Sequence, residues 1–461
     1  MKLSKRILAT LCVLAMVAAI FAGCNSGGSS SSSTGTDTGA ASASTASTDS
    51  GGGEESPAAS GESKEFSFMT WESEVMNQQI LESFKKFEDQ HPGVTIKLTP
   101  APLADYGTKI KSMISANSAP DVFMVGNDWV IQYGTTGNLY DWTALAEADG
   151  IMDTYYPGVV ENWKVDGKLY GFPGLLNTYG IFYNKDTFDA AGVDYPKDGW
   201  SYQDMLEKAA ALTSEDGDVH VYGVYTSARM DPFFVSTYPK SAGDLPFAEL
   251  IKGNTQVQAS PKFREVVGLI GEATQNKYIT DWEFTTSNAA TMFMEGKMPM
   301  MTAGQWYADE FIRNAPETLN WGFVSWPVAD ASNPAAIYDC TGWASSANIS
   351  DPETIYQVIK FIHTEMYADV LPQTPVAPSA AVDFAQPYYD KIIESGHPEM
   401  VDAMKYMLEC ENKLPVRFLD TYATDAQKFI DDGWGPIING TSTDEAIDKL
   451  VENINAVIAM P

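Results

Sequence analysis

From Phe66 onward, apolar positions recur with the period of a strand and then with that of a helix, in repeated alternation. Three strands are predicted, at Phe66–Trp71, Val94–Leu98 and Asp121–Val125. Two helices are predicted between them, one with a buried face of Met76, Ile80, Phe84 and Phe87 and one marked by Ile110, Met113 and Ile114. Strands that alternate with helices indicate a largely parallel sheet with covered faces, so we expect an α/β fold.

The stretch from Val165 to Trp200 predicts the passage of the chain from one lobe to another. Two short apolar runs, Leu169–Phe172 and Tyr179–Tyr183, stand on either side of Pro173-Gly174, a pair that is typical of a loop. A polar turn, a short helical piece and a second turn with Pro and Gly follow. We expect Phe172–Asn177 to be a hinge loop and the ligand to bind beside it.

The second half of the chain continues the alternation. Ser201 is an expected helix N-cap, because Asp204 follows three residues later and completes a capping box. Strands are expected at Val221–Tyr225, Pro299–Met301 and Asn320–Val324, with a strand or loop at Thr341–Ala347. Helices are expected at Phe263–Asn276, Ala289–Gly296, from Asp351 onward and at Thr443–Met460. The Pro-rich segment Leu371–Pro387 is expected to be irregular.

The N-terminus carries a targeting signal. Three cations precede the 15 apolar residues of Ile7–Phe21, a run that is typical of a secretory signal and shorter than the roughly 20 residues of a membrane-spanning helix. The run ends in Phe21-Ala22-Gly23-Cys24, which resembles a bacterial lipobox, although Phe21 stands where an aliphatic residue is usual. The resemblance implies a signal peptide at 1–23 and lipid attachment at Cys24. An ordinary signal peptide with a chance Cys is the alternative.

Residues 24–64 are rich in Ser, Gly, Thr and Ala and have neither an aromatic residue nor an apolar period. This composition predicts a flexible tether with a root-mean-square reach of roughly 35 Å. A body at 65–461 would thus be held at a membrane by its lipid and could still move above it.

Length and charge narrow the class of protein. The 461 residues are enough for two domains, and 44% of them are hydrophobic, so a substantial core is expected. After removal of the signal peptide, 26 Lys and Arg face 61 Asp and Glu, which leaves a charge of −35. Such a charge excludes nucleic acid as a partner and argues against electrostatic adsorption to anionic lipid.

The cysteines and histidines suggest neither a metal nor a cofactor. Besides Cys24, the mature chain has Cys340 and Cys410, which an exported setting permits to pair. Two separate buried thiols are an equally good interpretation. The four His residues are scattered along the chain and show no ligand spacing.

Five segments, in order, resemble the extracellular solute-binding proteins of ABC importers, in the family of maltose- and other sugar-binding proteins. They are Gln78–Leu98, Ala119–Leu145, Tyr183–Thr213, Ala289–Trp306 and Glu353–Ile362. The resemblance implies a two-lobe, periplasmic-binding-protein-like α/β fold with hinge crossovers and an interlobe ligand cleft. It implies a first lobe at 65–174 and 320–380 and a second at 178–315 and 385–461. It also implies a monomer that binds carbohydrate, delivers it to permease subunits and performs no catalysis.

Sugar rings have an apolar face that aromatic side chains cover and hydroxyls that carboxylates, amides and Arg satisfy. The resemblance implies ligand contacts at Trp71, Glu72, Asp128, Trp129, Asn177, Tyr179, Asp231, Phe233, Trp306, Trp343, Arg417 and Tyr422. Structural roles are the alternatives: a core position for Trp71 or Trp306, and a helix N-cap for Asp128.

Other functions remain open from the residues alone. An exported glycan enzyme would need paired carboxylates, but no spacing marks such a pair, and the common catalytic motifs are absent from the sequence. A glycan-binding sensor or adhesin, anchored in the same way, is a second alternative. A non-sugar solute is a third, because an acidic, aromatic cleft could also hold a cation.

Overall fold

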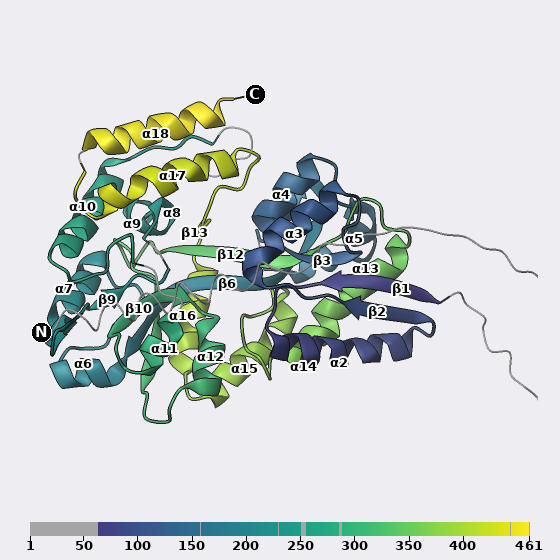
Figure 1. The fold of residues 1–461 in the computed structure, drawn as a ribbon, viewed down its shortest axis with the longest axis horizontal. Coiled ribbons are helices and arrows are strands. Elements are labelled where there is room, and N and C mark those ends of the chain that lie inside the picture. The colour runs from purple at the N-terminus through teal and green to yellow at the C-terminus, as the bar shows by residue number, and fades with distance from the viewer. Residues whose placement is uncertain are drawn as a thin grey trace, which may run out of the picture. The chain divides into compact units, whose positions relative to one another are not determined.

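Two long strands, β6 (Gly171–Asn184) and β12 (Ala335–Ala344), run side by side through the centre of the computed structural model (Figure 1). They belong to a nine-stranded sheet in the order β2 (Val94–Leu98), β1 (Lys64–Met69), β3 (Val122–Gly126), β12, β6, β10 (Met300–Gly304) and β9 (Val224–Tyr225). Two more strands join it: β11 (Trp321–Ser325) pairs with β6, and β13 (Asn412–Leu414) pairs with β12. The predicted α/β class is confirmed.

The structure describes residues 63–460 except 157, 229, 250–254, 285–287 and 443. The predicted signal peptide, Cys24 and the tether as far as residue 62 lie outside the described residues. Within the described part of the chain, no helix is both long and apolar enough to cross a membrane.

The first lobe consists of β1, β2 and β3 and the helices packed around them. Its helices are α2 (Glu74–Gln90), α3 (Leu103–Ser115), α4 (Asn127–Thr135), α5 (Thr143–Asp149), α13 (Pro352–Phe361) and α14 (Tyr367–Val370). Strand β1 is parallel to both of its neighbours, as predicted. The predicted face of α2 is confirmed, since Met76, Ile80, Phe84 and Phe87 are all buried. Ser73 begins that helix by accepting a hydrogen bond from the Met76 N–H.

The second lobe contains β9, β10, β11 and most of the remaining helices. These are α6 (Lys185–Ala191), α7 (Tyr202–Leu212), α8 (Pro232–Val235), α9 (Thr237–Ser241), α10 (Pro261–Gln275), α11 (Ala289–Met294), α12 (Tyr307–Asn314), α17 (Ala423–Ile438) and α18 (Asp444–Ile458). The capping box of Ser201 and Asp204 is confirmed at the start of α7. Two further helices, α15 (Gln386–Glu394) and α16 (Pro398–Glu409), were not predicted; α16 packs on β11.

The predicted loop conformation of Phe172–Asn177 is wrong, because these residues lie inside β6, a single strand of 14 residues, while their role as a hinge stays a prediction. Its first half pairs with β12, from Gly171 to Thr178, and its second half pairs with β10 and β11. The register with β12 places Leu175 opposite Thr341 and Pro173 opposite Gly342, so Gly174 is skipped. A β-bulge thus accommodates the Pro-Gly pair, at the kind of position where a residue without an N–H is tolerated.

The return of the chain to the first lobe also differs from the prediction. A return was expected from residue 320, but β11 pairs with Gly180–Asn184 of β6, beside β10, and so stays with the second lobe. The crossing is made by β12, whose residues Thr341–Ala344 pair with β3. The chain therefore passes from the second lobe to the first about 15 residues later than expected.

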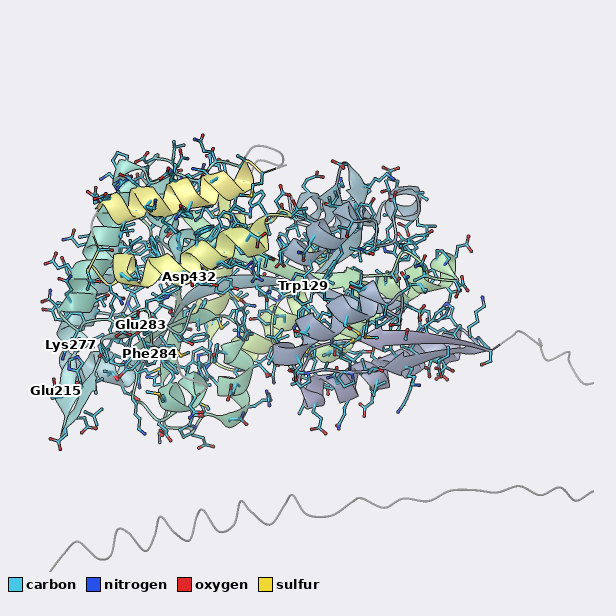
Figure 2. All side chains as sticks on the ribbon, turned by 45° about the horizontal axis from the view of Figure 1, so that its top comes forward. Trp129, Glu215, Lys277, Glu283, Phe284 and Asp432 are labelled. Carbon is cyan, nitrogen blue, oxygen red and sulfur yellow. The ribbon has the colours of Figure 1, made fainter. Side chains whose placement is uncertain are left out.

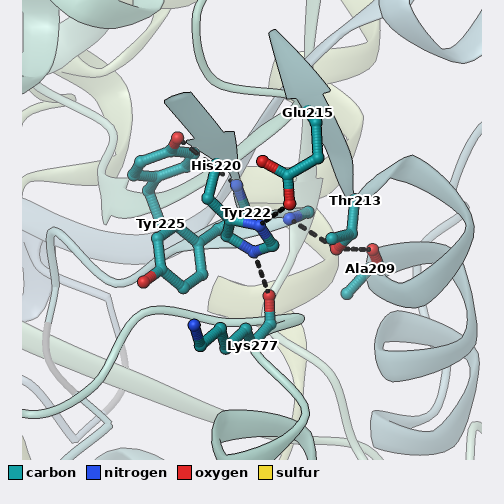
Figure 3. Close-up of polar contacts among 8 residues, drawn as sticks. Ala209, Thr213, Glu215, His220, Tyr222, Tyr225 and Lys277 are labelled. Carbon is teal, nitrogen blue, oxygen red and sulfur yellow. Dashed lines mark hydrogen bonds and ion pairs between the residues drawn. The ribbon is translucent and has the colours of Figure 1, made fainter. Parts of the chain in front are cut away.

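A small hairpin on the second lobe is attached by a histidine (Figure 3). It consists of β7 (Ser214–Asp216) and β8 (Val219–Val221). The two ring nitrogens of His220 lie 2.8 Å from Glu215 Oε1 and 2.9 Å from the carbonyl oxygen of Lys277. These two contacts, first of all the one with Glu215, raise the pKa of His220 above its ordinary value. The charged ring therefore ties the hairpin to the end of α10 most firmly at acid pH.

The two cysteines of the described residues are both buried and both free. Cys340 lies in β12, and burial raises the pKa of its thiol. Cys340 and Cys410 are therefore two separate buried thiols and do not form a disulfide.

The close contact between β12 and β6 predicts that Gly342→Ala lowers the stability of the fold. A Cβ at Gly342 would lie 2.0 Å from the carbonyl oxygen of Phe172 and 2.8 Å from the N atom of Gly174. Because both neighbours are backbone, the strands would have to separate, and we expect a loss of about 1–3 kcal/mol in the free energy of unfolding. Urea denaturation measures it.

Gly268→Ala in α10 is the matched control. A Cβ at Gly268 would have nothing within 4 Å, so we expect a gain of about 0.5–1 kcal/mol from helix propensity. Equal midpoints for Gly342→Ala and the parent would contradict the close packing of the two crossing strands.

Candidate functional site

Polar side chains gather where β6 changes partners. Thr178 is its last residue paired with β12, and Tyr179 is the first paired with β10. Side chains alternate along a strand, so Asn177 and Tyr179 point to the same face, and Asp339 of β12 lies opposite Asn177. The partner switch therefore presents an amide, a phenol and a carboxylate on one side of the crossing strands.

Arg417 connects this group to the first lobe. Its Nη2 lies 3.0 Å from Asp339 Oδ2, and its Nη1 lies 3.5 Å from Asp128 Oδ2. The Tyr179 hydroxyl donates to the same Asp339 oxygen at 3.3 Å. Asp128 is in the first turn of α4, while Arg417 follows β13, so one guanidinium bridges elements of both lobes. The N-cap of α4 is Gly126, which excludes the N-cap role for Asp128.

Asp339 is a buried carboxylate with an unused oxygen. Burial raises its pKa, and the nearby charge of Arg417 counteracts the rise. Its Oδ1 atom is buried and makes no hydrogen bond with any described residue. A buried acceptor without a donor is costly, by about 1–3 kcal/mol, so this oxygen suits a hydroxyl or amine brought by a ligand.

The Gly304-Gln305-Trp306 turn supplies an aromatic ring and an amide. A Cβ at Gly304 would lie 2.0 Å from the Trp306 ring, which explains the glycine: the indole folds back over it. Trp306 remains 37% exposed and meets the Tyr179 ring edge-on at 5.3 Å. Gln305 is fully buried, and its Oε1 accepts the Thr178 N–H at 2.6 Å. The turn is therefore locked to β6 and holds a large apolar ring at the surface.

A second aromatic group comes from the first lobe. Trp71 follows β1, Trp129 lies in α4, and their rings meet at 6.0 Å. Both pack on Tyr106, whose hydroxyl bonds the carbonyl oxygens of Met69 at the end of β1 and of Met124 within β3. In Figure 2, Trp129 lies on the side of the first lobe that borders the second. The two half-buried Trp rings therefore stand on a rigid base.

Two acidic groups flank these rings. Burial, with a smaller contribution from the charge of Asp309 in α12, raises the pKa of Glu72 to about 7. Asp309 is itself held by Arg313, whose Nε lies 2.9 Å from Asp309 Oδ1. Glu72 belongs to the first lobe and Asp309 to the second, so the charge of one lobe acts on a carboxyl group of the other.

Asp231 begins α8 as its N-cap, accepting the N–H groups of Phe233 and Phe234 at 2.8 and 3.2 Å. Burial raises its pKa to about 7 despite these bonds and the charge of Arg417. The predicted acid-Pro-aromatic-aromatic turn thus has its acid close to Arg417.

Two of the twelve predicted residues, Trp343 and Phe233, lie in the core instead, and a third, Tyr422, is partly buried against it. Trp343 is 1% exposed, packs on Phe68 at 4.7 Å and donates its indole N–H to the Tyr367 hydroxyl. Phe233 is 2% exposed and packs on Phe418. Tyr422 packs on the same ring at the start of α17. The positions of Trp343 and Phe233 in the sequence match the family pattern, but both side chains turn inward because hydrophobic neighbours pack against them.

Sequence reasoning missed Asp339 and Gln305. A signal was present for Asp339, since a lone carboxylate inside an otherwise apolar strand is rarely buried without a reason. Gln305 stood between the two residues of a matched motif but has no distinguishing pattern of its own. Among the described residues, no group of His, Cys, Asp and Glu has the arrangement of a metal site.

Comparison with known proteins places the chain in a family. Residues 82–382 match the family described as bacterial extracellular solute-binding proteins, over more than half of the chain. The chain belongs to this family. Its members are binding proteins that act outside the cytoplasm, so an extracytoplasmic location applies to this chain.

Relatives within the family carry sugar-binding names. The galactooligosaccharide-binding protein of Bacillus subtilis is 24% identical over 332 residues, which are 68% of this chain and 72% of that protein. A putative binding protein of Brucella abortus is 23% identical over 321 residues, covering 66% and 73%.

Solved structures show the two-lobe fold for this family member. An ABC substrate-binding protein of Listeria monocytogenes, in complex with cycloalternan, superposes with a TM-score of 0.70 at 22% identity, over 86% of this chain and 99% of that one. The GacH receptor of Streptomyces glaucescens superposes with a TM-score of 0.67 at 21% identity, over 86% and 98%.

The bridging role of Arg417 predicts a pH-dependent loss of stability in Arg417→Gln. Without the guanidinium, Asp339 stays buried beside a neutral group, and its folded pKa rises further above the unfolded value of about 3.9. A raised carboxylate pKa costs stability as pH increases, so the deficit relative to the parent should be small near pH 4 and grow to about 1–2 kcal/mol at pH 7. Urea denaturation at both pH values measures it.

Arg264→Gln is the control, because Arg264 also faces two carboxylates, those of Asp444 and Asp448, but at an exposed site. We expect a loss below about 1 kcal/mol there. A pH-independent deficit in Arg417→Gln would show that the buried carboxylate is not the cause.

Proposed function

We propose that this protein is the substrate-binding component of an ABC importer, that it captures a mono- or oligosaccharide between its lobes, and that it delivers the sugar to permease subunits. The observation that carries the proposal is the pairing of two aromatic groups from opposite lobes with buried hydrogen-bond acceptors between them. Trp71 and Trp129 come from the first lobe and Trp306 from the second. No chemistry on the ligand is needed.

The chemistry of these groups suits a sugar. An exposed indole such as Trp306 covers the apolar face of a pyranose ring, while carboxylates and amides accept its hydroxyl protons. Asp339 Oδ1 is an acceptor that no described residue satisfies. Glu72, Asp128, Asn177 and Asp231 add polar groups around it, and we propose all four, with Tyr179 and Arg417, as contacts.

The names of the relatives support carbohydrate rather than another solute. They include a galactooligosaccharide-binding and a maltodextrin-binding protein of Bacillus subtilis, and a structural neighbour is bound to cycloalternan. We infer the same ligand class for this chain.

We further propose that the lobes close on the sugar. Contacts from both lobes to one ligand exist only in a closed arrangement, so the ligand selects that arrangement by its differential affinity. The bending would occur along β6 and β12, the two strands that link the lobes. The closed form would then dock on the permease.

The first experiment is a thermal-shift screen of the mature protein against mono- and oligosaccharides, followed by calorimetry of the best ligand. A sugar at 100 times its dissociation constant should stabilise the protein by about 2.7 kcal/mol. For Trp306→Ala we expect binding to weaken by about 2 kcal/mol, roughly thirtyfold, because an aromatic anchor is lost.

Tyr195→Ala is the control, since Tyr195 is as exposed as Trp306, at 37%, but belongs to the loop after α6. It should bind like the parent. The proposal fails if no carbohydrate in the screen shifts the melting temperature, and Trp306 leaves the site if its variant binds with unchanged affinity.

We also propose that Cys24 carries the lipid anchor. The sequence pattern at Phe21–Cys24 supports this, together with the extracytoplasmic location of the family. In a bacterial host, the parent should incorporate labelled palmitate and sediment with membranes, whereas Cys24→Ala should do neither. A Cys24→Ala variant that still incorporates label would overturn the assignment.

A further inference from the structure

A hollow lies on the other side of the crossing strands from the candidate sugar site. Its volume is about 360 Å³, within the usual range of ligand pockets. We call it the reverse-face pocket and define it by six of its lining residues: Asn127, Asn162, Lys240, Glu249, Tyr338 and Lys413. The first two belong to the first lobe, Tyr338 to β12, and the others to segments of the second lobe or to β13.

The pocket and the sugar site are separated by β12. Tyr338, which lines the pocket, and Asp339, which contacts Arg417, are consecutive residues of this strand. Consecutive side chains of a strand point to opposite faces. The pocket is therefore distinct from the site proposed for sugar, although both are lined by residues of the two lobes.

The pocket carries an excess of positive charge, whereas the chain as a whole is strongly negative. Two ammonium groups, Lys240 and Lys413, face one carboxylate, Glu249. The Lys240 Nζ lies 3.6 Å from Glu249 Oε1, beyond a good hydrogen bond, and the Lys413 Nζ donates to the carbonyl oxygen of Cys410 at 3.0 Å. Both ammonium groups keep donors to spare, in a protein whose formal charge is −32.

Some hydrogen-bond donors and acceptors that line the same pocket have no partner among the described residues. Asn127 is only 5% exposed, and its side chain makes no hydrogen bond with any described residue. Asn162 Nδ2 donates to the Tyr338 hydroxyl at 3.1 Å, which leaves the Asn162 carbonyl oxygen and the phenol proton for another partner. The amide of Asn127 lines the pocket and can therefore donate to or accept from a polar occupant.

The backbone adds to this preference. Asn127 is the first residue of α4, and its N-cap, Gly126, supplies no side-chain oxygen to the first turn. The positive end of the helix dipole therefore points toward the region of Asn127. The carboxylate of Asp128 in the same turn is engaged by Arg417.

We propose that the reverse-face pocket binds a small organic anion with one or more carboxylate groups. Lys240 and Lys413 supply the charge, and Asn127, Asn162 and Tyr338 supply directed hydrogen bonds. At roughly 30 Å³ per water-sized group, the pocket has room for about a dozen non-hydrogen atoms, which is close to the size of citrate and more than succinate needs. This site does not depend on the nature of the ligand in the sugar cleft.

The test uses calorimetry of the mature protein with citrate, succinate and inorganic phosphate at low ionic strength, with succinamide as the neutral counterpart of succinate. We expect citrate or succinate to bind in the millimolar range or tighter and succinamide to bind at least about tenfold more weakly. Lys413→Met and Asn127→Leu should each weaken carboxylate binding by about tenfold. If either variant fails to fold, Tyr338→Phe takes its place, and it should also weaken carboxylate binding because it removes the phenol hydroxyl from the pocket.

Lys262→Met is the matched control, because Lys262 pairs with Glu265 on the exposed face of α10. It should bind the anions like the parent. The proposal is overturned if none of the carboxylates binds, if succinamide binds as well as succinate, or if Lys262→Met weakens binding as much as Lys413→Met. Tighter binding of phosphate than of either carboxylate would also overturn the stated ligand class.

Discussion

The pairing of β6 with β12 is the interaction on which the rest of the structure depends. One strand of 14 residues hydrogen-bonds to β12 along its first half and to β10 and β11 along its second, so two sheets become one. The contact is close enough that Gly342 is required, because a side chain there would meet the backbone of β6. The lobes are thus linked by backbone bonds, which are insensitive to side-chain changes elsewhere.

The same strands explain why polar groups can gather between the lobes. Where β6 exchanges β12 for β10, its side chains border both lobes, and ligand sites often lie at such domain interfaces. Asp339 is stable there because Arg417 offsets part of the cost of its burial. Arg417 in turn contacts Asp128 of the first lobe, so the charge balance of this site depends on both lobes.

How much of this could be predicted differs between elements. The alternation of strands and helices, the buried face of α2 and the capping box of α7 follow from local periodicity and local hydrogen bonds, and they were predicted correctly. The strand conformation of Phe172–Asn177 was not, because Pro173 and Gly174 are typical of a loop, and only the partner strand reveals that they form a bulge. Of the residues predicted to contact the ligand, Trp306 is 37% exposed and its role stays a prediction, whereas Trp343 is buried in the core.

The sequence by itself determined the α/β class, the family and the kinds of side chain available for a ligand, since these depend on residue type and spacing along the chain. Only the tertiary structure decided which of those side chains meet. Asp339, Arg417 and Asp128 are separated by tens to hundreds of residues, and their contact depends on strand register and loop path. The reverse-face pocket, likewise, arises from segments that approach one another only in the folded chain.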